Sequence, residues 1–228
     1  MNRAFVVLLA AGEGERLGRG PKAFLEIGGR SLLAIAVERA AACPGVEGLV
    51  VAVPGGLEDR ASGMVRTSKS VSAVAGGAHR QDSVRVALQA VPEAAEVVVC
   101  HDAARPFAQP ELFTAVIEAL SDAEGVVPAL TPPDTVKRVR DGFVEATLDR
   151  DALRLTQTPQ AFVAPALREA HHRAHAEGVR WTDDAGLMEW AGFRVRVVPG
   201  DPGNFKITSP EDLARAERLL LELPPVGV

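Results

Sequence analysis

The sequence contains no tyrosine and little cysteine, lysine or asparagine. The two cysteines, Cys43 and Cys100, show no metal-ligand spacing, and Cys100 ends an apolar run like a buried small residue. We therefore expect free thiols in a reducing compartment. No apolar stretch approaches the roughly 18 residues that a transmembrane helix needs, and the first residues lack a signal-peptide pattern. These absences lead us to expect a cytoplasmic protein with no membrane partner.

The charge balance argues against a further class of partner. The net charge is −5, which does not favour binding to nucleic acid. Hydrophobic residues make up 47% and charged residues 24%, as in ordinary globular proteins. At roughly 150 residues per domain, the 228 residues predict one domain, 1–228, large enough to fold without disulfides.

Lysine is scarce but is placed in conspicuous motifs. The 25 basic residues include only four lysines, and three of them, Lys22, Lys137 and Lys206, lie in motifs described below. Lysine is a compact point charge that suits a single phosphate oxygen, whereas arginine suits a bidentate contact. A genome rich in G and C would explain the same scarcity, so both explanations stay open.

Apolar runs alternate with helical patterns over most of the chain. Strands that are buried on both faces and separated by helices are typical of an α/β fold with a doubly wound, mostly parallel sheet. The expected strands are 5–9, 49–53, 71–74, 96–100, 125–128 and 193–198, and the expected helices are 31–43, 82–91, 110–120, 165–176, 183–191 and one that starts at 210.

The pattern changes between residues 131 and 154. Two short segments of alternating polar and apolar residues flank Asp141-Gly142, a strong hairpin signal. Because the segment holds too little apolar material for a core, we expect a protruding β-hairpin arm. Such an arm is suited to clasping another subunit.

The first loop, 10–22, follows the strand 5–9 and is rich in glycine. Backbone N–H groups in such loops surround phosphates, and this loop also carries two cations, Arg16 and Lys22. It ends in no Gly-Lys-Ser/Thr and has no G-x-G-x-x-G spacing. An ordinary βα turn explains the loop equally well when it is considered alone.

Two further motifs follow expected strands. The segment GGAHRQDSV at 76–84 combines a glycine turn with Arg80 and Ser83, which indicates either ligand binding or a capped helix. The segment HDAARP at 101–106 places Asp102 beyond a strand end, where α/β sheets bind ligands. His101 is better explained as a hydrogen-bonded structural histidine, and Arg105 as a partner of Asp102, a ligand-binding residue, or both.

The remaining motifs are weak when taken singly. Thr135, Lys137 and Arg150 fit a solvated ribbon, and 158–160 fits a turn. The segment TDDA at 182–185 is typical of a helix N-cap with acids in the first turn. Residues 203–208 predict a short strand, on which Lys206 could be an ordinary surface residue.

Taken in order, however, these motifs resemble those of the 2-C-methyl-D-erythritol 4-phosphate cytidylyltransferases of the non-mevalonate isoprenoid pathway. One departure is Ala23, where the family commonly has glutamine, and we expect it to affect loop packing more than chemistry. The matching segments span nearly the whole chain: AAGEGERLGRGPK (10–22), GGAHRQDSV (76–84), HDAARP (101–106), DTVKRV (134–139), TPQAF (158–162), TDDA (182–185) and NFKIT (204–208).

The resemblance implies a Rossmann-like nucleotidyltransferase fold and a homodimer joined through the arm, 131–154. It implies CTP and 2-C-methyl-D-erythritol 4-phosphate as substrates, pyrophosphate as a product and Mg²⁺ as the cofactor. In such a reaction the substrate phosphate attacks the α-phosphate of CTP in line. The enzyme must mainly supply positive charge around the phosphorus.

The resemblance also assigns the site residues. The catalytic candidates are Arg16, Lys22, Arg150 and Lys206. The nucleotide-binding candidates are Ala10, Ala11, Gly12, Gly14, Gly77, Arg80, Ser83, Asp102 and Ala103. The acceptor-binding candidates are Asp102, Arg105, Thr135, Arg150 and Lys206, of which Thr135 and Arg150 would serve the partner subunit's site. Asp102 is the candidate metal ligand.

Two other functions stay open. A cytidylyltransferase for another polyol phosphate, such as ribitol 5-phosphate, would have similar loops. A non-catalytic, nucleotide-binding regulatory module is a different class, but it would not need both Arg16 and Lys22. A dinucleotide-dependent oxidoreductase is disfavoured because no acidic residue follows the strand 49–53.

Overall fold

Four parallel strands form one half of the sheet in the computed structural model, which describes residues 3–12 and 20–222. They are β1 (Ala4–Leu9), β4 (Val46–Val53), β5 (Ser70–Ala75) and β6 (Val97–Asp102). Valine-rich runs form β1, β4 and β6 because both faces of these strands are covered. In register, Leu9 lies opposite both Ala52 and Asp102, so the carboxyl ends of these strands share one edge.

The other half of the sheet is mixed. The strand β11 (Gln160–Val163) lies antiparallel between β6 and β7 (Gly125–Leu130), where we had predicted only a turn at 158–160. Two edge elements also pair with β7: β10 (Leu155–Thr156) and β12 (Val195–Pro199). The eight-stranded sheet has the order β10-β7-β11-β6-β1-β4-β5, with β12 on β7. The mostly parallel sheet is thus confirmed.

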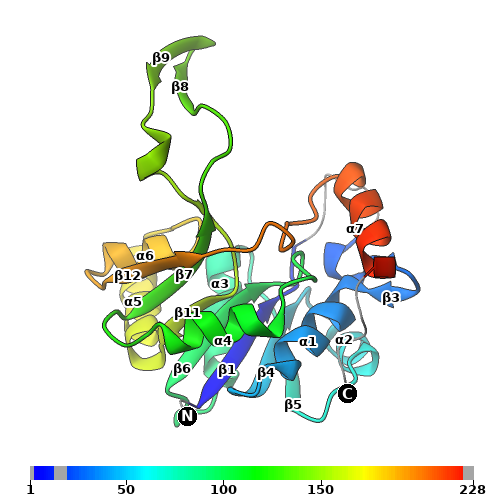
Figure 1. Ribbon diagram of the computed structural model, residues 1–228. Helices are drawn as coiled ribbons and strands as arrows, with labels where there is room; N and C mark the ends of the chain where they lie inside the picture. Colours follow the sequence, from blue (N-terminus) through cyan, green and yellow to red (C-terminus); the bar gives the residue numbers. More distant parts are fainter. Residues whose placement is uncertain (1–2, 13–19, 223–228) are drawn as a thin grey trace.

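Helices cover both faces of this sheet (Figure 1). On one face, the apolar sides of α1 (Leu32–Ala42), α2 (Glu58–Met64) and α4 (Pro110–Glu118) form a core with β1, β4 and β6. The other face buries side chains of α3 (Arg80–Ala90), α5 (Ala164–Glu177) and α6 (Asp184–Trp190). The doubly wound arrangement that we predicted is therefore present.

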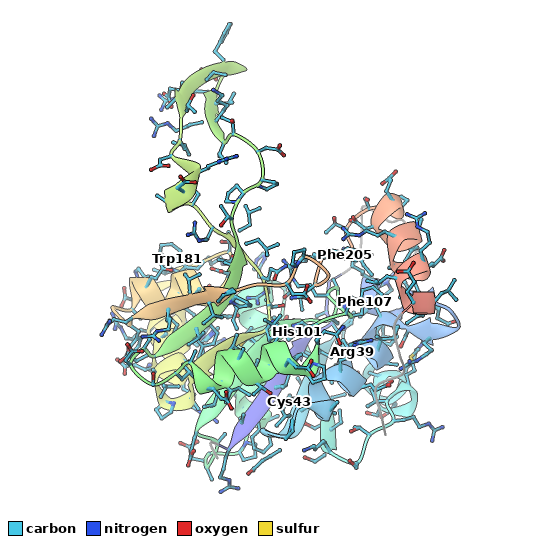
Figure 2. All side chains as sticks on the ribbon, in the orientation of Figure 1. Arg39, Cys43, His101, Phe107, Trp181 and Phe205 are labelled. Carbon is cyan, nitrogen blue, oxygen red and sulfur yellow. The ribbon has the colours of Figure 1, made fainter. Side chains whose placement is uncertain are left out.

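A third, smaller core lies beside the sheet. It contains Ile27, Phe107 and Ile207, and Phe205 packs on Phe107 with ring centroids 5.9 Å apart (Figure 2). It joins the hairpin of β2 (Glu26–Ile27) and β3 (Arg30–Ser31), the start of α1 and the last helix, α7 (Pro210–Glu222). The turn η2 (Lys22–Phe24), just before this hairpin, packs on the first core instead. Residues 203–208 form an extended loop rather than the predicted strand, because Ile207 is held by this core and not by a neighbouring strand.

The predicted β-hairpin arm is present and projects away from the sheet (Figure 1). It is formed by β8 (Lys137–Arg140) and β9 (Phe143–Thr147), with the short turn η3 (Arg150–Ala152) at its base. At its tip Asp141 and Gly142 take φ values of 51° and 83°, which Asp-Gly tolerates in a tight hairpin turn. Within the described residues, no helix combines the length and hydropathy needed to cross a bilayer.

Candidate functional site

Three loops meet at the carboxyl edge of the parallel strands. The backbone N–H of Ala10 donates to Ala52 O at 2.8 Å, and that of Ala103 donates to Leu9 O at 3.0 Å. On the outer side, Gly76 N donates to the carbonyl oxygen of Val53 at 2.7 Å. Each loop thus continues the hydrogen bonding of its strand for one more residue. The candidate nucleotide-binding segments at 10–12, 76–77 and 102–103 therefore lie side by side.

The two glycines at 76–77 allow close packing between these loops. A Cβ on Gly76 would lie 2.6 Å from the Cβ of Ala11 and 2.9 Å from Ser83 Oγ. A Cβ on Gly77 would lie 2.4 Å from the Cβ of Asp82. The hydroxyl of Ser83 accepts from Gly77 N at 3.1 Å, which fixes the loop against the start of α3. Glycine is thus needed here for space, since neither residue has a positive φ.

Lys22 connects the first loop to the segment that carries Lys206. Its backbone N–H donates to the carbonyl oxygen of Gly12 at 3.3 Å, and its Nζ donates to that of Ile207 at 2.6 Å. The ammonium group of Lys22 is therefore tied to the stretch of chain that carries Lys206. Gly14 and Arg16, the other candidates in this loop, lie outside the described residues.

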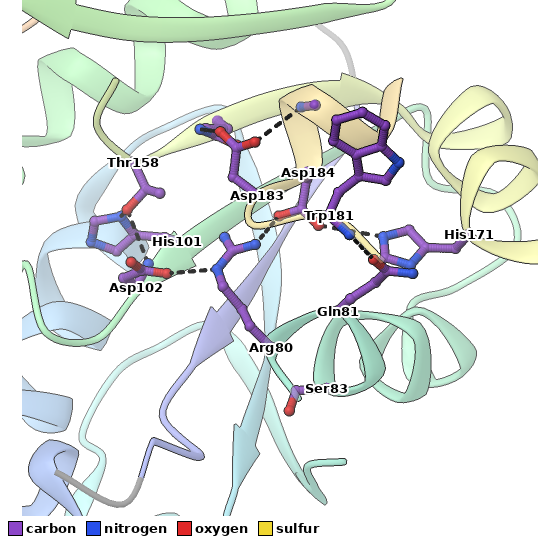
Figure 3. A network of polar contacts seen from close by, with 12 residues as sticks. Arg80, Gln81, Ser83, His101, Asp102, Thr158, His171, Trp181, Asp183 and Asp184 are labelled. Carbon is purple, nitrogen blue, oxygen red and sulfur yellow. Dashed lines mark hydrogen bonds and ion pairs between the residues drawn. The ribbon is translucent and has the colours of Figure 1, made fainter. Parts of the chain in front are cut away.

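Asp102 is held between two cations. Arg80 Nε donates to its Oδ1 at 3.2 Å (Figure 3). Lys206 Nζ donates to its Oδ2 at 2.7 Å. Burial favours the neutral acid, but the charges of Arg80 and Lys206 outweigh it and lower the pKa of Asp102 well below its usual range. The carboxylate is consequently ionised at any physiological pH.

Arg80 is itself shared between two carboxylates. Its Nη1 donates to Asp184 Oδ2 at 2.7 Å, while Asp184 Oδ1 lies 3.4 Å from Nε2 of the buried His171. Burial disfavours the guanidinium, but Asp184 and Asp102 together raise the pKa of Arg80 above its usual value. Burial likewise opposes the ionised form of Asp184, yet Arg80 and His171 lower its pKa to about 2.

Asp184 belongs to this network, although the sequence pattern did not indicate it. We assigned the segment 182–185 to helix capping, and Asp183 does cap α6, since its Oδ1 accepts from Gly186 N at 3.0 Å. Asp184 instead points inward and is only 1% exposed. The sequence does hold one sign of this role, since two acids follow each other at the start of the helix. One acid suffices for the cap, which leaves the second for another contact.

His101 and Arg105 serve the shape of the loop after β6. The Nε2 of His101 contacts Arg105 O at 3.1 Å, and its Nδ1 contacts Thr158 Oγ1 at 3.0 Å. A carbonyl only accepts, so Nε2 carries the proton. Arg105 Nη1 donates to Asn204 O at 2.8 Å. Among the described residues, the ion-pair partners of Asp102 are Arg80 and Lys206, so Arg105 is not the hydrogen-bonded partner that we had considered.

The remaining candidates, Thr135 and Arg150, lie on the arm. Arg150 Nη1 donates to Pro133 O at 2.9 Å, and Thr135 is exposed. The arm follows the end of β7 and projects away from the sheet (Figure 1). The structure therefore groups the other described candidates in one region and keeps Thr135 and Arg150 apart from them.

At this edge, a divalent metal would find one suitable protein ligand, the carboxylate of Asp102. No three His, Cys, Asp or Glu side chains gather as a metal site in the described part of the chain. Asp102 is an ionised oxygen ligand, and each of its oxygens keeps a second lone pair beyond its ion-pair contact. Mg²⁺ commonly takes one or two carboxylates and completes its shell with substrate phosphates and water. Asp102 thus fits as a single protein ligand.

The sequence relatives agree on one family. A family model described as 2-C-methyl-D-erythritol 4-phosphate cytidylyltransferase (IspD) matches residues 4–222. The enzyme of that name from Deinococcus radiodurans is 45% identical over 217 residues, which cover 95% of this chain and 89% of the relative. A bifunctional enzyme IspD/IspF from an Anaeromyxobacter species is 47% identical over 227 residues. This chain spans 58% of the length of that longer relative.

Solved structures give the same answer. A 4-diphosphocytidyl-2C-methyl-D-erythritol synthase from Anaerococcus prevotii superposes with a TM-score of 0.86 at 30% identity, covering 96% of this chain and 99% of that one. The 2-C-methyl-D-erythritol 4-phosphate cytidylyltransferase from Thermus thermophilus is 38% identical, with a TM-score of 0.79 and coverage of 96% and 98%. The chain belongs to the 2-C-methyl-D-erythritol 4-phosphate cytidylyltransferase family.

Proposed function

We propose that this chain transfers CMP from CTP to 2-C-methyl-D-erythritol 4-phosphate and releases pyrophosphate. The observation that carries the proposal is the cluster at the sheet edge. Lys206 contacts Asp102 there, and Lys22 is tied to Ile207. The cations lie beside glycine loops that pack too closely for any side chain at 76 or 77. This combination suits a triphosphate and a second phosphate group in one place.

The chemistry follows from charge. An oxygen of the acceptor phosphate attacks the α-phosphorus of CTP in line, the bond to the bridging oxygen breaks, and pyrophosphate leaves. No protein nucleophile is required. Negative charge grows on the oxygens around phosphorus, and fixed cations stabilise it more than they stabilise the ground state. Lys22, together with Arg16 in the loop outside the described residues, would supply that charge.

The two substrates would be held by two sets of residues that share Asp102. The nucleotide would bind along the backbone of Ala10, Ala11, Gly12 and Gly14 and against Gly77, Arg80, Ser83, Asp102 and Ala103. Asp102, Arg105 and Lys206 would hold the acceptor. The proximity of the described members of the first set supports this division, since their loops extend neighbouring strands.

Mg²⁺ would be held by Asp102 together with substrate oxygens. When bound, it would neutralise triphosphate charge and polarise the phosphoryl oxygens. Arg80 and Lys206 keep the carboxylate ionised and therefore ready to act as a ligand. The proposed compartment is the cytoplasm, and Cys43 and Cys100 are both free thiols that suit it.

The active form would be a homodimer of single-domain subunits joined through the arm, 131–154. Three large apolar side chains on the hairpin are more than half exposed: Val139, Phe143 and Val144. Apolar exposure of this extent on a projecting ribbon suits contact with a second copy. Such contact would bring Thr135 and Arg150 to the acceptor site of the partner subunit. It would therefore explain why these two residues lie away from Asp102 of their own subunit.

A pyrophosphate-release assay tests the proposal. CTP, UTP, ATP and GTP would each be offered with 2-C-methyl-D-erythritol 4-phosphate and, separately, with ribitol 5-phosphate. We expect release only with CTP and the methylerythritol phosphate. Release only with the ribitol phosphate would move the function to the other cytidylyltransferase. Nucleotide binding without release from any pair would indicate the regulatory module instead.

A further inference from the structure

Asp184 is a buried carboxylate with no part in the proposed chemistry. It begins α6, is 1% exposed and contacts Arg80 and His171 (Figure 3). An ionised carboxylate removed from water is costly unless it is paired. Its principal partner, Arg80, is also the residue that contacts Asp102. Asp184 is therefore one side chain away from Asp102.

We propose that Asp184 is a positioning residue that holds the Arg80 guanidinium against Asp102 and so orients the Asp102–Lys206 pair. The inference deepens the proposed function and rests on it for its kinetic consequence. The orientation of Arg80 by Asp184 concerns the free protein and does not depend on the reaction. His171 would support Asp184 from the opposite side.

The contacts of Arg80 show why one carboxylate would not suffice. Its Nε donates to Asp102 and its Nη1 to Asp184, whereas the buried Nη2 has no hydrogen-bond partner in the described part of the chain. The plane of the guanidinium is thus fixed by two contacts at different nitrogens. Without Asp184, the 3.2 Å contact to Asp102 would be the one side-chain hydrogen bond left to orient this group among the described residues.

The charges along the network alternate. The ion pairs connect four side chains whose charges are negative and positive in turn: Asp184, Arg80, Asp102 and Lys206. If Asp184 becomes neutral, Arg80 and Lys206 share a single carboxylate. Arg80 would then compete for both Asp102 oxygens, and the ammonium of Lys206 would lose its fixed position. The acceptor phosphate would meet a displaced cation.

The neighbouring Asp183 offers a matched comparison. It supplies the helix cap through Gly186 N and also accepts from Gln160 Nε2 at 3.3 Å. Both Asp183→Asn and Asp184→Asn remove one negative charge at the start of α6, and asparagine caps helices as well as aspartate does. A general effect on α6 would therefore be similar in the two variants.

Steady-state kinetics test the positioning role. We expect Asp184→Asn to lower kcat/KM for the acceptor phosphate about 10- to 100-fold, as for other residues that orient a site ligand. Asp183→Asn should stay within about twofold of the wild type because it leaves Arg80 untouched. In an Asp102→Asn background, Asp184→Asn should cause no further loss, since its route of action is already removed. Losses that multiply in the double variant would overturn the inference.

A spectroscopic measurement does not depend on turnover. The Arg80 Nε–H proton, assigned by its disappearance in Arg80→Lys, should give a slowly exchanging NMR signal in the wild type and in Asp183→Asn. We expect faster exchange in Asp184→Asn, and unchanged exchange would contradict the inference. If Asp184→Asn does not fold, His171→Gln takes its place and should accelerate the same exchange. A wild type that releases no pyrophosphate would instead refute the proposed function, while the NMR result still decides the geometry.

Discussion

Asp102 shows how a single side chain connects several motifs of the sequence. It lies at the end of β6, where strand pairing fixes its backbone, and Thr158 Oγ1 accepts from its N–H at 3.0 Å. Its two oxygens then meet cations that come from residues 80 and 206. At the scale of residues, the site consists of charges that are paired in the free protein and would exchange partners when phosphates arrive.

The first prediction concerns Lys22. Lys22→Ala should leave the fold intact, because the buried side chains of this turn are those of the neighbouring Ala23 and Phe24. Turnover should fall about a hundredfold or more, the usual cost of removing one group that stabilises transition-state charge. Pyrophosphate release measures the loss, and circular dichroism checks the fold. Unaltered turnover would remove Lys22 from the proposed chemistry.

The second prediction concerns His101 and pH. Burial lowers the pKa of His101 from 6.5 to about 4, so the folded protein keeps the ring neutral while the unfolded chain takes up a proton. Its contribution to stability is therefore complete above pH 6.5 and is lost as the pH falls towards 4. A pKa change of this size corresponds to about 3 kcal/mol.

Urea denaturation at a series of pH values checks this. The free energy of unfolding of the wild type should fall by about 3 kcal/mol more than that of His101→Gln across this interval. The ionised Asp102 and Asp184 act in a lower range, since their lowered pKa values matter only below the ordinary value of 3.8. Parallel pH curves for the two proteins would show that folding does not lower the pKa of His101.

At the scale of elements, α7 holds the segment that carries Lys206. Ser209 Oγ accepts from Asp212 N at 3.3 Å, while Asp212 Oδ2 accepts from Ser209 N at 2.9 Å and from Thr208 N at 2.8 Å. This is a reciprocal capping box, with Pro210 at the first helical position. Because Thr208 is two residues from Lys206, the cap fixes the lysine segment as well as the helix.

The third prediction is that Asp212→Ala weakens this end of the helix by about 1 kcal/mol, the usual cost of a lost cap. Partial burial opposes ionisation of Asp212, but hydrogen bonds from Thr208 and Ser209 outweigh it and lower its pKa below 3.8. The stabilisation that ionised Asp212 gives to the helix end is thus present above pH 3.8 and is lost as the pH falls through the folded-state pKa. Faster hydrogen exchange of the α7 amides would report the change, and equal exchange in both proteins would argue against the cap.

At the scale of the whole molecule, the arm is the feature that one subunit does not explain. It leaves Phe143 78% exposed at the tip and carries two acceptor-binding candidates away from the other candidates. A projecting ribbon with apolar residues is a hazard for a monomer but suits a dimer in which each arm reaches across. The proposed dimer would account for both its exposure and its charges.

The fourth prediction is complementation between inactive subunits. Lys22→Ala and Arg150→Ala should each be inactive, one for lack of a cation in the body and the other for lack of one on the arm. Mixed and reassembled in equal amounts, they should recover about a quarter of the wild-type turnover, since half of the dimers would contain one intact site. A mixture as inactive as its components would mean that Arg150 serves its own subunit or no site.

Local pattern was sufficient to predict most of the elements. Valine-rich runs predicted the central strands, and Asp141-Gly142 predicted the hairpin, because periodicity and turn residues act over a few neighbours in the chain. The strand Gln160–Val163 was missed for the converse reason. It pairs antiparallel between two strands that are far from it in sequence, and nothing within its four residues indicates those partners.

The site divides in the same way. By itself the sequence determined which residues carry charge, which turns need glycine, and the family motifs in which they occur. Only the tertiary structure decided that Arg80 bridges Asp102 and Asp184, that Lys206 rather than Arg105 pairs with Asp102, and that Arg150 lies apart. Backbone propensity is a property of adjacent residues, whereas an ion pair depends on distances that exist only once the sheet and its helices have packed.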